Sequence, residues 1–284
     1  MTEQQNSNGV RVTVIGAGVL GSAIAKNMAK NGYQVHATRR RPEKAKDLEN
    51  FGITVSNDNK RAVSEAEVVF FALKPYNVIP AARELSDVMD GKLCISMAAG
   101  LDLDLLTSVF PDVKWVRAMT NTCVAVQKGF TVYCPCKLVQ DSEAKLIESL
   151  FATMGEVEKV EERFMNPLTA ISGSGPAYFY TVIEALTFGG LKVGIPRDLA
   201  CRAAAHTAVG AAELLLERGL HPAELRDQVL TPGGTTIEGI YELEVSQIRA
   251  NFMNAVTAAT KRGNQLAEIV REQAWKQLEE DNEK

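Results

Sequence analysis

A six-residue segment in the last quarter of the chain, Thr231-Pro232-Gly233-Gly234-Thr235-Thr236, has the composition of a small-anion site. Two successive glycines let backbone N–H groups approach a ligand with no Cβ in the way. The following residues, 237–244, place apolar side chains among acidic ones as a helix would. A glycine-rich turn that opens a helix presents unpaired N–H donors and the positive end of the helix dipole to a carboxylate or phosphate. An ordinary helix N-cap has the same appearance, so this segment alone identifies no ligand.

A second glycine-rich segment, Gly16-Ala17-Gly18-Val19-Leu20-Gly21, lies near the other end of the chain. It follows a β-branched stretch, 10–15, and precedes an alanine-rich helical stretch, 22–30. The pattern GxGxxG is weak evidence by itself, but between a strand and a helix it is typical of dinucleotide binding. The first glycine permits the tight turn, the second admits the pyrophosphate, and the third lets the helix pack close to the strand. We therefore expect a nucleotide cofactor here.

The residues after the second expected strand indicate which nicotinamide nucleotide is preferred. In NAD-binding units an acidic side chain about 20 positions after the glycines holds the ribose 2′-hydroxyl. Here Arg39, Arg40 and Arg41 occupy that region. Guanidinium groups match phosphate geometry, so the sequence favours NADPH over NADH. The nearby Glu43 leaves NADH possible.

Composition excludes several other classes of function. The chain has 284 residues, of which 46% are apolar, and a net charge of −4. That length allows two domains, and that charge gives no reason to expect nucleic acid as a partner. No apolar run approaches the roughly 18 residues of a membrane-spanning helix, so no membrane is expected. Residues 1–9 lack the apolar core of a signal peptide and are expected to be a loose tail.

Five scattered cysteines give no metal-binding pattern. Cys134 and Cys136 are close together, but without a second pair or neighbouring histidines their spacing is poor for zinc, and no metal is expected. Reduced, mostly buried thiols are typical of a reducing compartment, so we expect a cytoplasmic protein.

Residues 10–163 alternate strand-like and helical stretches, which predicts a Rossmann-type, doubly wound parallel sheet with helices on both faces. The expected strands are 10–15, 34–38, 53–55, 68–72, 93–97, 113–117 and 129–134. The expected helices are 20–30, 43–50, 61–65, 78–89, 103–109 and 143–154.

Residues 164–284 have no strand-like stretches and form an expected second, all-α domain. Its helices are expected at 177–193, 197–217, 224–229, 236–244 and 248–278. The first of them is apolar nearly all round, which indicates burial. A small helical domain with such a helix can bury it against a second copy of itself, so we expect a homodimer formed by this C-terminal domain. The fold class is therefore α/β with a C-terminal helical dimerisation domain.

Five motifs together resemble one enzyme family. They occur in this order: Phe71-Ala72-Leu73-Lys74-Pro75, Ser96-Met97-Ala98-Ala99-Gly100, Met119-Thr120-Asn121-Thr122, Ser172-Gly173-Ser174-Gly175-Pro176-Ala177-Tyr178 and the segment Thr231–Thr236. This set is similar to that of the pyrroline-5-carboxylate reductases, and the resemblance runs from about Val10 to the final helix. The chain departs from the family pattern at Cys123, where members usually have proline, and at Thr231, which is often serine.

The resemblance implies NAD(P)H-dependent reduction of pyrroline-5-carboxylate to L-proline, the last step of proline biosynthesis. It also implies interlocked dimers, which can assemble into decamers. The cofactor would be bound by residues in three loops, with Asn59 near the adenosine. These are Ile15, Gly16, Ala17, Gly18, Val19 and Leu20; Ala72, Leu73, Lys74 and Pro75; and Ala98, Ala99 and Gly100. In the family, the substrate site uses the loop that matches Gly233, Gly234 and Thr236.

The substrate is a flat ring with one carboxylate and one C=N bond, so the protein's main contribution is orientation. The backbone amides of residues 233–236, Thr235 included, can hold the carboxylate at the start of a helix. The Thr236 hydroxyl could hydrogen-bond the ring nitrogen and position its proton, and Thr231 could do so through water. A hydroxyl is a weak acid, so we expect positioning from Thr236 rather than outright proton donation.

Two other functions remain open on the sequence alone, and a third is disfavoured. A reductase of a related cyclic imine would use the same motifs, because one extra ring atom changes binding by only about 1–3 kcal/mol. A non-catalytic NADP-binding sensor is a second alternative. A 3-hydroxy acid dehydrogenase is disfavoured, because the segment 166–171 lacks the lysine that such enzymes generally need there.

Overall fold

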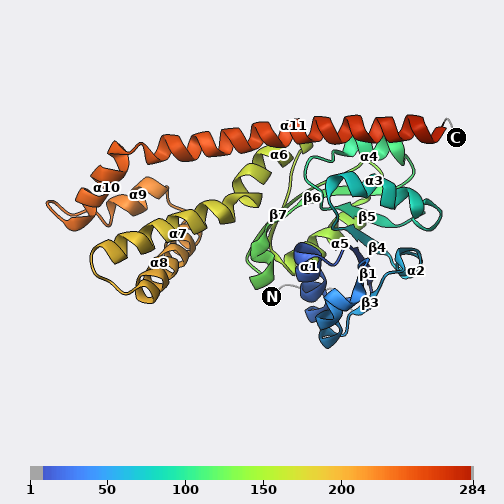
Figure 1. The fold of residues 1–284 in the computed structure, drawn as a ribbon, viewed down its shortest axis with the longest axis horizontal. Helices are drawn as coiled ribbons and strands as arrows, with labels where there is room; N and C mark the ends of the chain where they lie inside the picture. The colour runs from blue at the N-terminus through green and yellow to red at the C-terminus, as the bar shows by residue number, and fades with distance from the viewer. Residues whose placement is uncertain (1–8, 283–284) are drawn as a thin grey trace. The chain divides into compact units, whose positions relative to one another are not determined.

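The computed structural model describes residues 9–282 (Figure 1). By its internal contacts the chain divides into two units. The first consists of the residues up to Ser174 together with those from Ala259 onward, and the second runs from Gly175 to Ala258. The expected tail lies, apart from Gly9, outside the described residues. The expected domain boundary between residues 163 and 164 stays a prediction, since a division by contacts does not define domains.

The first unit contains a sheet of eight strands, all in the described part of the chain, in the order β3-β2-β1-β4-β5-β6-β7-β8. Adjacent strands are parallel except β6 and β7. The strands are β1 (Arg11–Ile15), β2 (Gln34–Thr38), β3 (Thr54–Ser56), β4 (Val68–Phe71), β5 (Leu93–Ser96), β6 (Lys114–Met119), β7 (Gly129–Pro135) and β8 (Gly155–Lys159). All seven expected strands are confirmed, and β8 is additional. The Rossmann-type fold class is confirmed as well.

Helices and short helical turns connect these strands or follow the last of them. They are α1 (Val19–Lys30), η1 (Pro42–Phe51), α2 (Asn59–Glu65), α3 (Pro75–Glu84), η2 (Ser86–Val88), α4 (Leu103–Val109), η3 (Thr122–Val126), α5 (Asp141–Ala152), η4 (Glu162–Phe164), α6 (Met165–Leu168) and η5 (Thr169–Gly173). The helix expected at 43–50 is the 3₁₀ segment η1, which is kinked at Ala45. Two carboxylates fix helix starts, because Asp58 accepts a hydrogen bond from the Arg61 N–H and Asp102 accepts one from the Leu105 N–H.

The central strands bury both of their faces. Along β4, Val68 and Phe70 belong to one apolar cluster, while Val69 and Phe71 belong to a second. Alternate residues of a strand point to opposite faces of a sheet, so helices must cover both faces, as in doubly wound folds. The second cluster also includes Val270 from the last helix, α11 (Ile248–Asn282).

The second unit is helical. It contains α7 (Gly175–Lys192), α8 (Arg197–Arg218), α9 (Pro222–Asp227), α10 (Thr235–Val245) and the first residues of α11. In α7 the buried residues are Gly175 and Thr187, although most of the helix is apolar. Within residues 9–282, α8 alone is long and apolar enough to cross a membrane, with a mean hydropathy of 1.2 over an 18-residue window. Helices of soluble proteins also meet that criterion.

Candidate active site

The glycine loop after β1 has the geometry of a dinucleotide-binding turn. Gly16 has a φ of +99°, and the N–H groups of Gly16 and Ala17 donate to the Thr38 carbonyl at 3.0 and 2.8 Å. A Cβ on Gly21 would collide with the Gly16 carbonyl oxygen, so the third glycine is sterically required. Gly18 has no side chain to cap α1, and Val19 is 86% exposed. The first turn of α1 therefore offers backbone donors to an anion.

The loop after β4 lies directly against this turn. A Cβ on Gly16 would lie 2.6 Å from the Ala72 carbonyl oxygen and 2.8 Å from Leu73 Cδ2. Lys74 is exposed and precedes the first residue of α3, Pro75. The structure thus brings the first two cofactor loops together at the carboxyl edge of the sheet, where ligands of such sheets bind.

The three arginines after β2 have different surroundings. Arg39 donates from Nη1 to the Ala17 carbonyl at 2.9 Å and to the Lys44 carbonyl at 3.1 Å, so it holds the glycine loop in place. Arg40 and Arg41 are exposed. The Arg39 N–H donates to the carbonyl of Ser56, the last residue of β3, and Asn59 begins the helix that follows β3. The expected contacts of these residues with a nucleotide stay predictions.

The Ala98–Gly100 loop follows β5 on the same edge. The Met97 N–H donates to the Phe71 carbonyl at 3.1 Å, which places this loop beside the loop after β4. Ala98 and Gly100 are buried, and Gly100 has a φ of +73°. A Cβ on Gly100 would lie 3.1 Å from the backbone nitrogen of Ala267 in α11. The loop therefore packs backbone against backbone on the last helix.

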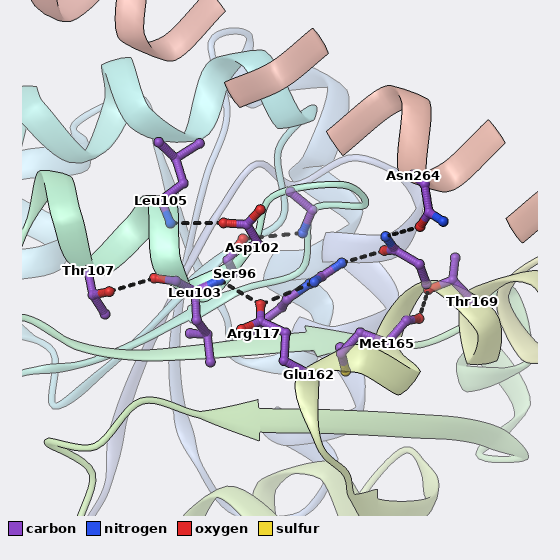
Figure 2. A network of polar contacts seen from close by, with 12 residues as sticks. Ser96, Asp102, Leu103, Leu105, Thr107, Arg117, Glu162, Met165, Thr169 and Asn264 are labelled. Carbon is purple, nitrogen blue, oxygen red and sulfur yellow. Dashed lines mark hydrogen bonds and ion pairs between the residues drawn. The ribbon is translucent and has the colours of Figure 1, made fainter. Parts of the chain in front are cut away.

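A buried arginine organises the polar groups beyond this loop (Figure 2). The Arg117 side chain, 4% exposed, donates from Nη1 to Glu162 Oε1 at 3.2 Å and from Nη2 to Asn166 Oδ1 at 2.6 Å. Glu162 Oε1 also accepts the Leu103 N–H at 2.6 Å, which ties η4 to the start of α4. Asn166 Nδ2 donates to Asn264 Oδ1 of α11 at 2.8 Å.

An ion pair adds a further tie to α11. Arg271 Nη2 donates to Asp102 Oδ2 at 2.8 Å, and this hydrogen bond raises the pKa of the guanidinium above its usual value. The sequence analysis missed both this pair and the Arg117 network. One signal was present, because Arg117 ends an expected strand, 113–117, whose other residues apart from Lys114 are apolar.

Asn121, in the third family motif, is a second residue whose role the sequence did not reveal. Its Oδ1 accepts the Cys123 N–H at 2.9 Å, and its Nδ2 donates to the Ser172 carbonyl at 3.0 Å. Ser172 lies in η5, a π-helical turn in which the Ser174 N–H donates to the Thr169 carbonyl at 2.9 Å. Such turns are frequent at functional sites. Asn121 therefore fixes the glycine- and serine-rich segment just before α7.

The expected substrate loop lies in the helical unit and has the predicted form. Gly233 has a φ of +66°, and α10 begins at Thr235 directly after Gly234. The Gly234 N–H donates to the Thr231 carbonyl at 3.0 Å, and a Cβ on Gly234 would collide with Thr231 Oγ1. Thr231 and Thr235 are exposed and Thr236 is partly buried. The loop thus presents backbone donors and hydroxyls, but its role in binding substrate stays a prediction.

The cysteines and acidic side chains of residues 9–282 form neither a metal-binding cluster nor a disulfide. No cluster of three or more His, Cys, Asp or Glu side chains there could hold a metal ion. The five cysteines are free thiols, and the expectation that they are mostly buried is wrong, because Cys94 alone is buried and Cys201 is exposed. Burial raises the pKa of Cys94 to about 12. A protonated, enclosed thiol of this kind is unreactive.

Comparison with protein families separates the chain into two matched regions. Residues 162–266 match the model described as pyrroline-5-carboxylate reductase dimerisation, which indicates self-association. Residues 11–100 match the model described as NADP oxidoreductase, coenzyme F420-dependent. The second range contains both the glycine loop and the Ala98–Gly100 loop.

Relatives and solved structures cover nearly the whole chain. The pyrroline-5-carboxylate reductase of Pisum sativum is 38% identical over 258 residues, which are 89% of this chain and 94% of that protein. The enzyme of the same name from Arabidopsis thaliana is 36% identical over 91% of this chain and 96% of that protein. A Coxiella burnetii pyrroline-5-carboxylate reductase structure matches with a TM-score of 0.85, 32% identity, and coverage of 92% and 99%. A Plasmodium falciparum pyrroline carboxylate reductase structure with NADP bound matches with a TM-score of 0.84 and 28% identity, and the match covers 92% of this chain and 99% of that one. With such identity over most of its length, the chain belongs to the pyrroline-5-carboxylate reductase family.

Proposed function

We propose that this protein reduces pyrroline-5-carboxylate to L-proline with NADPH as the preferred reductant. The observation that carries the proposal is family membership over 89% of the chain. The relatives named above carry this activity in their names, and one related structure contains NADP. The geometry of the two glycine-rich segments is consistent with it.

The first unit has the features that NADPH requires. Gly16 and Gly21 allow the close backbone approach that a pyrophosphate needs, and the first turn of α1 supplies N–H donors. We assign the cofactor to the residues of the three loops listed above, with Asn59 beside the adenosine. Arg40 and Arg41, exposed next to the glycine loop, are suited to the 2′-phosphate. Bound NADPH supplies the hydride that reaches the imine carbon.

The loop before α10 supplies the groups that the substrate requires. The backbone amides of residues 233–236 hold the ring carboxylate at the positive end of the helix dipole. The Thr236 hydroxyl hydrogen-bonds the ring nitrogen and keeps its proton in place, and Thr231 assists through water. Since the protonated imine is the better hydride acceptor, the protein contributes orientation rather than strong acid catalysis.

Self-association gives the apolar surfaces of α7 and α8 a partner, and we assign them to a homodimer that can assemble further into a decamer. This assembly also accounts for the apolar composition of α8 without a membrane. We place the enzyme in the cytoplasm.

The test is the absorbance decay of NADPH, and separately of NADH, with purified protein and pyrroline-5-carboxylate. Oxidation with proline as the product, faster with NADPH, is expected. If the protein binds NADPH but oxidises neither nucleotide in the presence of pyrroline-5-carboxylate, the proposed substrate is wrong, and other cyclic imines should be assayed next.

The Thr236→Ala variant tests the role of the hydroxyl in that assay. We expect kcat/KM to fall about tenfold, the loss of one hydrogen bond of about 1.4 kcal/mol in the transition state. The exposed Thr235→Ala variant is the control, because it keeps the backbone donor and removes a hydroxyl from the neighbouring position. A wild-type kcat/KM for Thr236→Ala would exclude Thr236 from the mechanism.

A further inference from the structure

We infer that the last part of α11 braces the Ala98–Gly100 loop, and that Asn264 and Arg271 are positioning residues for NADPH binding. The inference rests on the proposed assignment of this loop to NADPH. It concerns a part of the helix that mostly lies beyond the dimerisation match, which ends at residue 266.

Of the three residues after Ala99, two lie against α11 directly, and the residue between them belongs to an apolar cluster that includes residues of α11. The backbone of Gly100 packs against the backbone at Leu266 and Ala267. Leu101, fully buried, belongs to the same apolar cluster as Val270 and Ala274. The Asp102 carboxylate accepts the hydrogen bond from Arg271. The loop thus leaves the sheet edge and is held immediately by the helix.

The Arg117 network holds the helix from a second side. Asn264 accepts from Asn166, which in turn accepts from the buried Arg117 guanidinium. Arg117 lies on β6 opposite Ser96, the last residue of β5, from which the loop departs. Figure 2 shows Arg117 directed past Glu162 toward Asn264 on α11. Helix α11 is therefore tied through Asn166 to Arg117 on β6, and directly to Asp102 just after the loop.

Such a brace affects nucleotide binding because a backbone loop can present its N–H groups only if it is held in one conformation. Gly100 has a positive φ and follows two alanines, so the loop has no polar side chain of its own with which to fix that conformation. If α11 moves away, the loop gains freedom that nucleotide binding must remove. Affinity then falls while the chemistry at saturation is unchanged.

The test is a variant that removes both side-chain ties, Asn264→Ala with Arg271→Ala. Alanine favours helix, and Val270 and Ala274 stay in place, so α11 is retained. The control is Glu268→Ala with Lys276→Ala, two exposed positions of the same helix. Two quantities are measured: the Kd for NADPH by fluorescence titration, and amide hydrogen exchange of residues 98–102 without nucleotide.

We expect faster exchange in residues 98–102 and a Kd for NADPH raised about fivefold, a factor that corresponds to about 1 kcal/mol. The kcat at saturating NADPH should stay within about twofold of wild type. A variant with lysine in place of Arg271, Arg271→Lys, should bind NADPH more tightly than the double alanine variant does, because it keeps a positive charge near Asp102. A lowered melting temperature with an unchanged Kd would show a structural role only and overturn the inference. If the wild type binds no NADPH, the proposed function is wrong. The hydrogen exchange of residues 98–102 then still shows whether α11 holds the loop, because that measurement uses no nucleotide.

Discussion

At the scale of single residues, the three arginines after β2 divide between holding the protein and facing solvent. Arg39 is committed to two backbone carbonyls, whereas Arg40 and Arg41 are exposed. From the sequence we predicted that all three bind phosphate as one group. Only the structure separates them, because the Ala17 carbonyl that Arg39 holds is 22 residues away along the chain.

This division predicts different effects on the two nucleotides. Replacing Arg40 and Arg41 by serine should raise KM for NADPH about tenfold and leave KM for NADH unchanged, because only NADPH has the 2′-phosphate that they would bind. Arg39→Ala should instead weaken both nucleotides, since it releases the glycine loop. Steady-state kinetics with each nucleotide measures this, with the exposed Lys46→Ser as control. Equal changes in the two KM values for the double serine variant would contradict the assignment.

The second prediction at this scale concerns Gly234. An alanine there would place its Cβ against Thr231 Oγ1, so either the Thr231 side chain must turn away or the loop must open. We expect KM for pyrroline-5-carboxylate to rise about tenfold or more, since a shift of about 1 Å in positioning groups can have still larger effects. Thr231→Ala in the same chain removes the clashing hydroxyl and should lower KM part of the way, since the water-mediated contact of Thr231 is lost as well. A double variant no better than Gly234→Ala alone would show that the collision does not limit binding.

At the scale of elements, Gly100 and Gly91 form a matched pair that isolates the packing of a loop on α11. Both have positive φ, +73° and +69°. A Cβ on Gly91 would meet no heavy atom within 4 Å among the described residues, whereas one on Gly100 would press on the α11 backbone. Substituting alanine at Gly91 should cost about 1 kcal/mol of backbone strain. The same change at Gly100 should cost about 2–3 kcal/mol, because the helix must also shift.

Urea unfolding of the two variants measures the difference in the free energy of unfolding. A circular dichroism spectrum of each native state confirms that the helices are retained. Equal destabilisation of the two variants would mean that α11 yields at no cost and would contradict the close packing seen at Ala267.

The elements also show which parts of the fold the sequence could predict. Strand β4 was found because its residues are continuously apolar, as a strand buried on both faces requires, and β1 was found because it is rich in β-branched residues. Strand β8 was missed because it reads Gly-Glu-Val-Glu-Lys, with three charged residues, and lies at the sheet edge, where such residues are tolerated. The glycine loops were found because their geometry needs a residue without a Cβ.

The polar ties could not be predicted in the same way. Arg117 meets partners 45 and 49 residues along the chain, and Arg271 pairs with a carboxylate 169 residues away. Local spacing contains no information on such pairs, because they form only when elements distant along the chain are packed together.

At the scale of the whole molecule, the helical unit exposes more apolar surface than one chain of this kind would leave to water. Phe179 and Tyr180 in α7 and Val209 and Leu216 in α8 are between 55% and 83% exposed. All four lie in the range that matches the dimerisation model. Large exposed apolar patches mark interaction sites, and here a second copy of the chain is the partner that the family match indicates.

A charged residue in such a surface should therefore break the assembly. Phe179→Glu combined with Leu216→Glu would force two carboxylates per chain into an apolar interface, a desolvation cost of several kcal/mol for each. Sedimentation velocity at micromolar concentration should show the smaller species, and activity should fall on dilution if the dimer completes the enzyme. The control is Val126→Glu with Leu138→Glu, exposed apolar residues of the first unit outside the dimerisation match. It should sediment as the wild type does. Wild-type sedimentation of the α7 and α8 variant would instead place the interface on other helices of the unit, such as α10, where Tyr241 is 63% exposed.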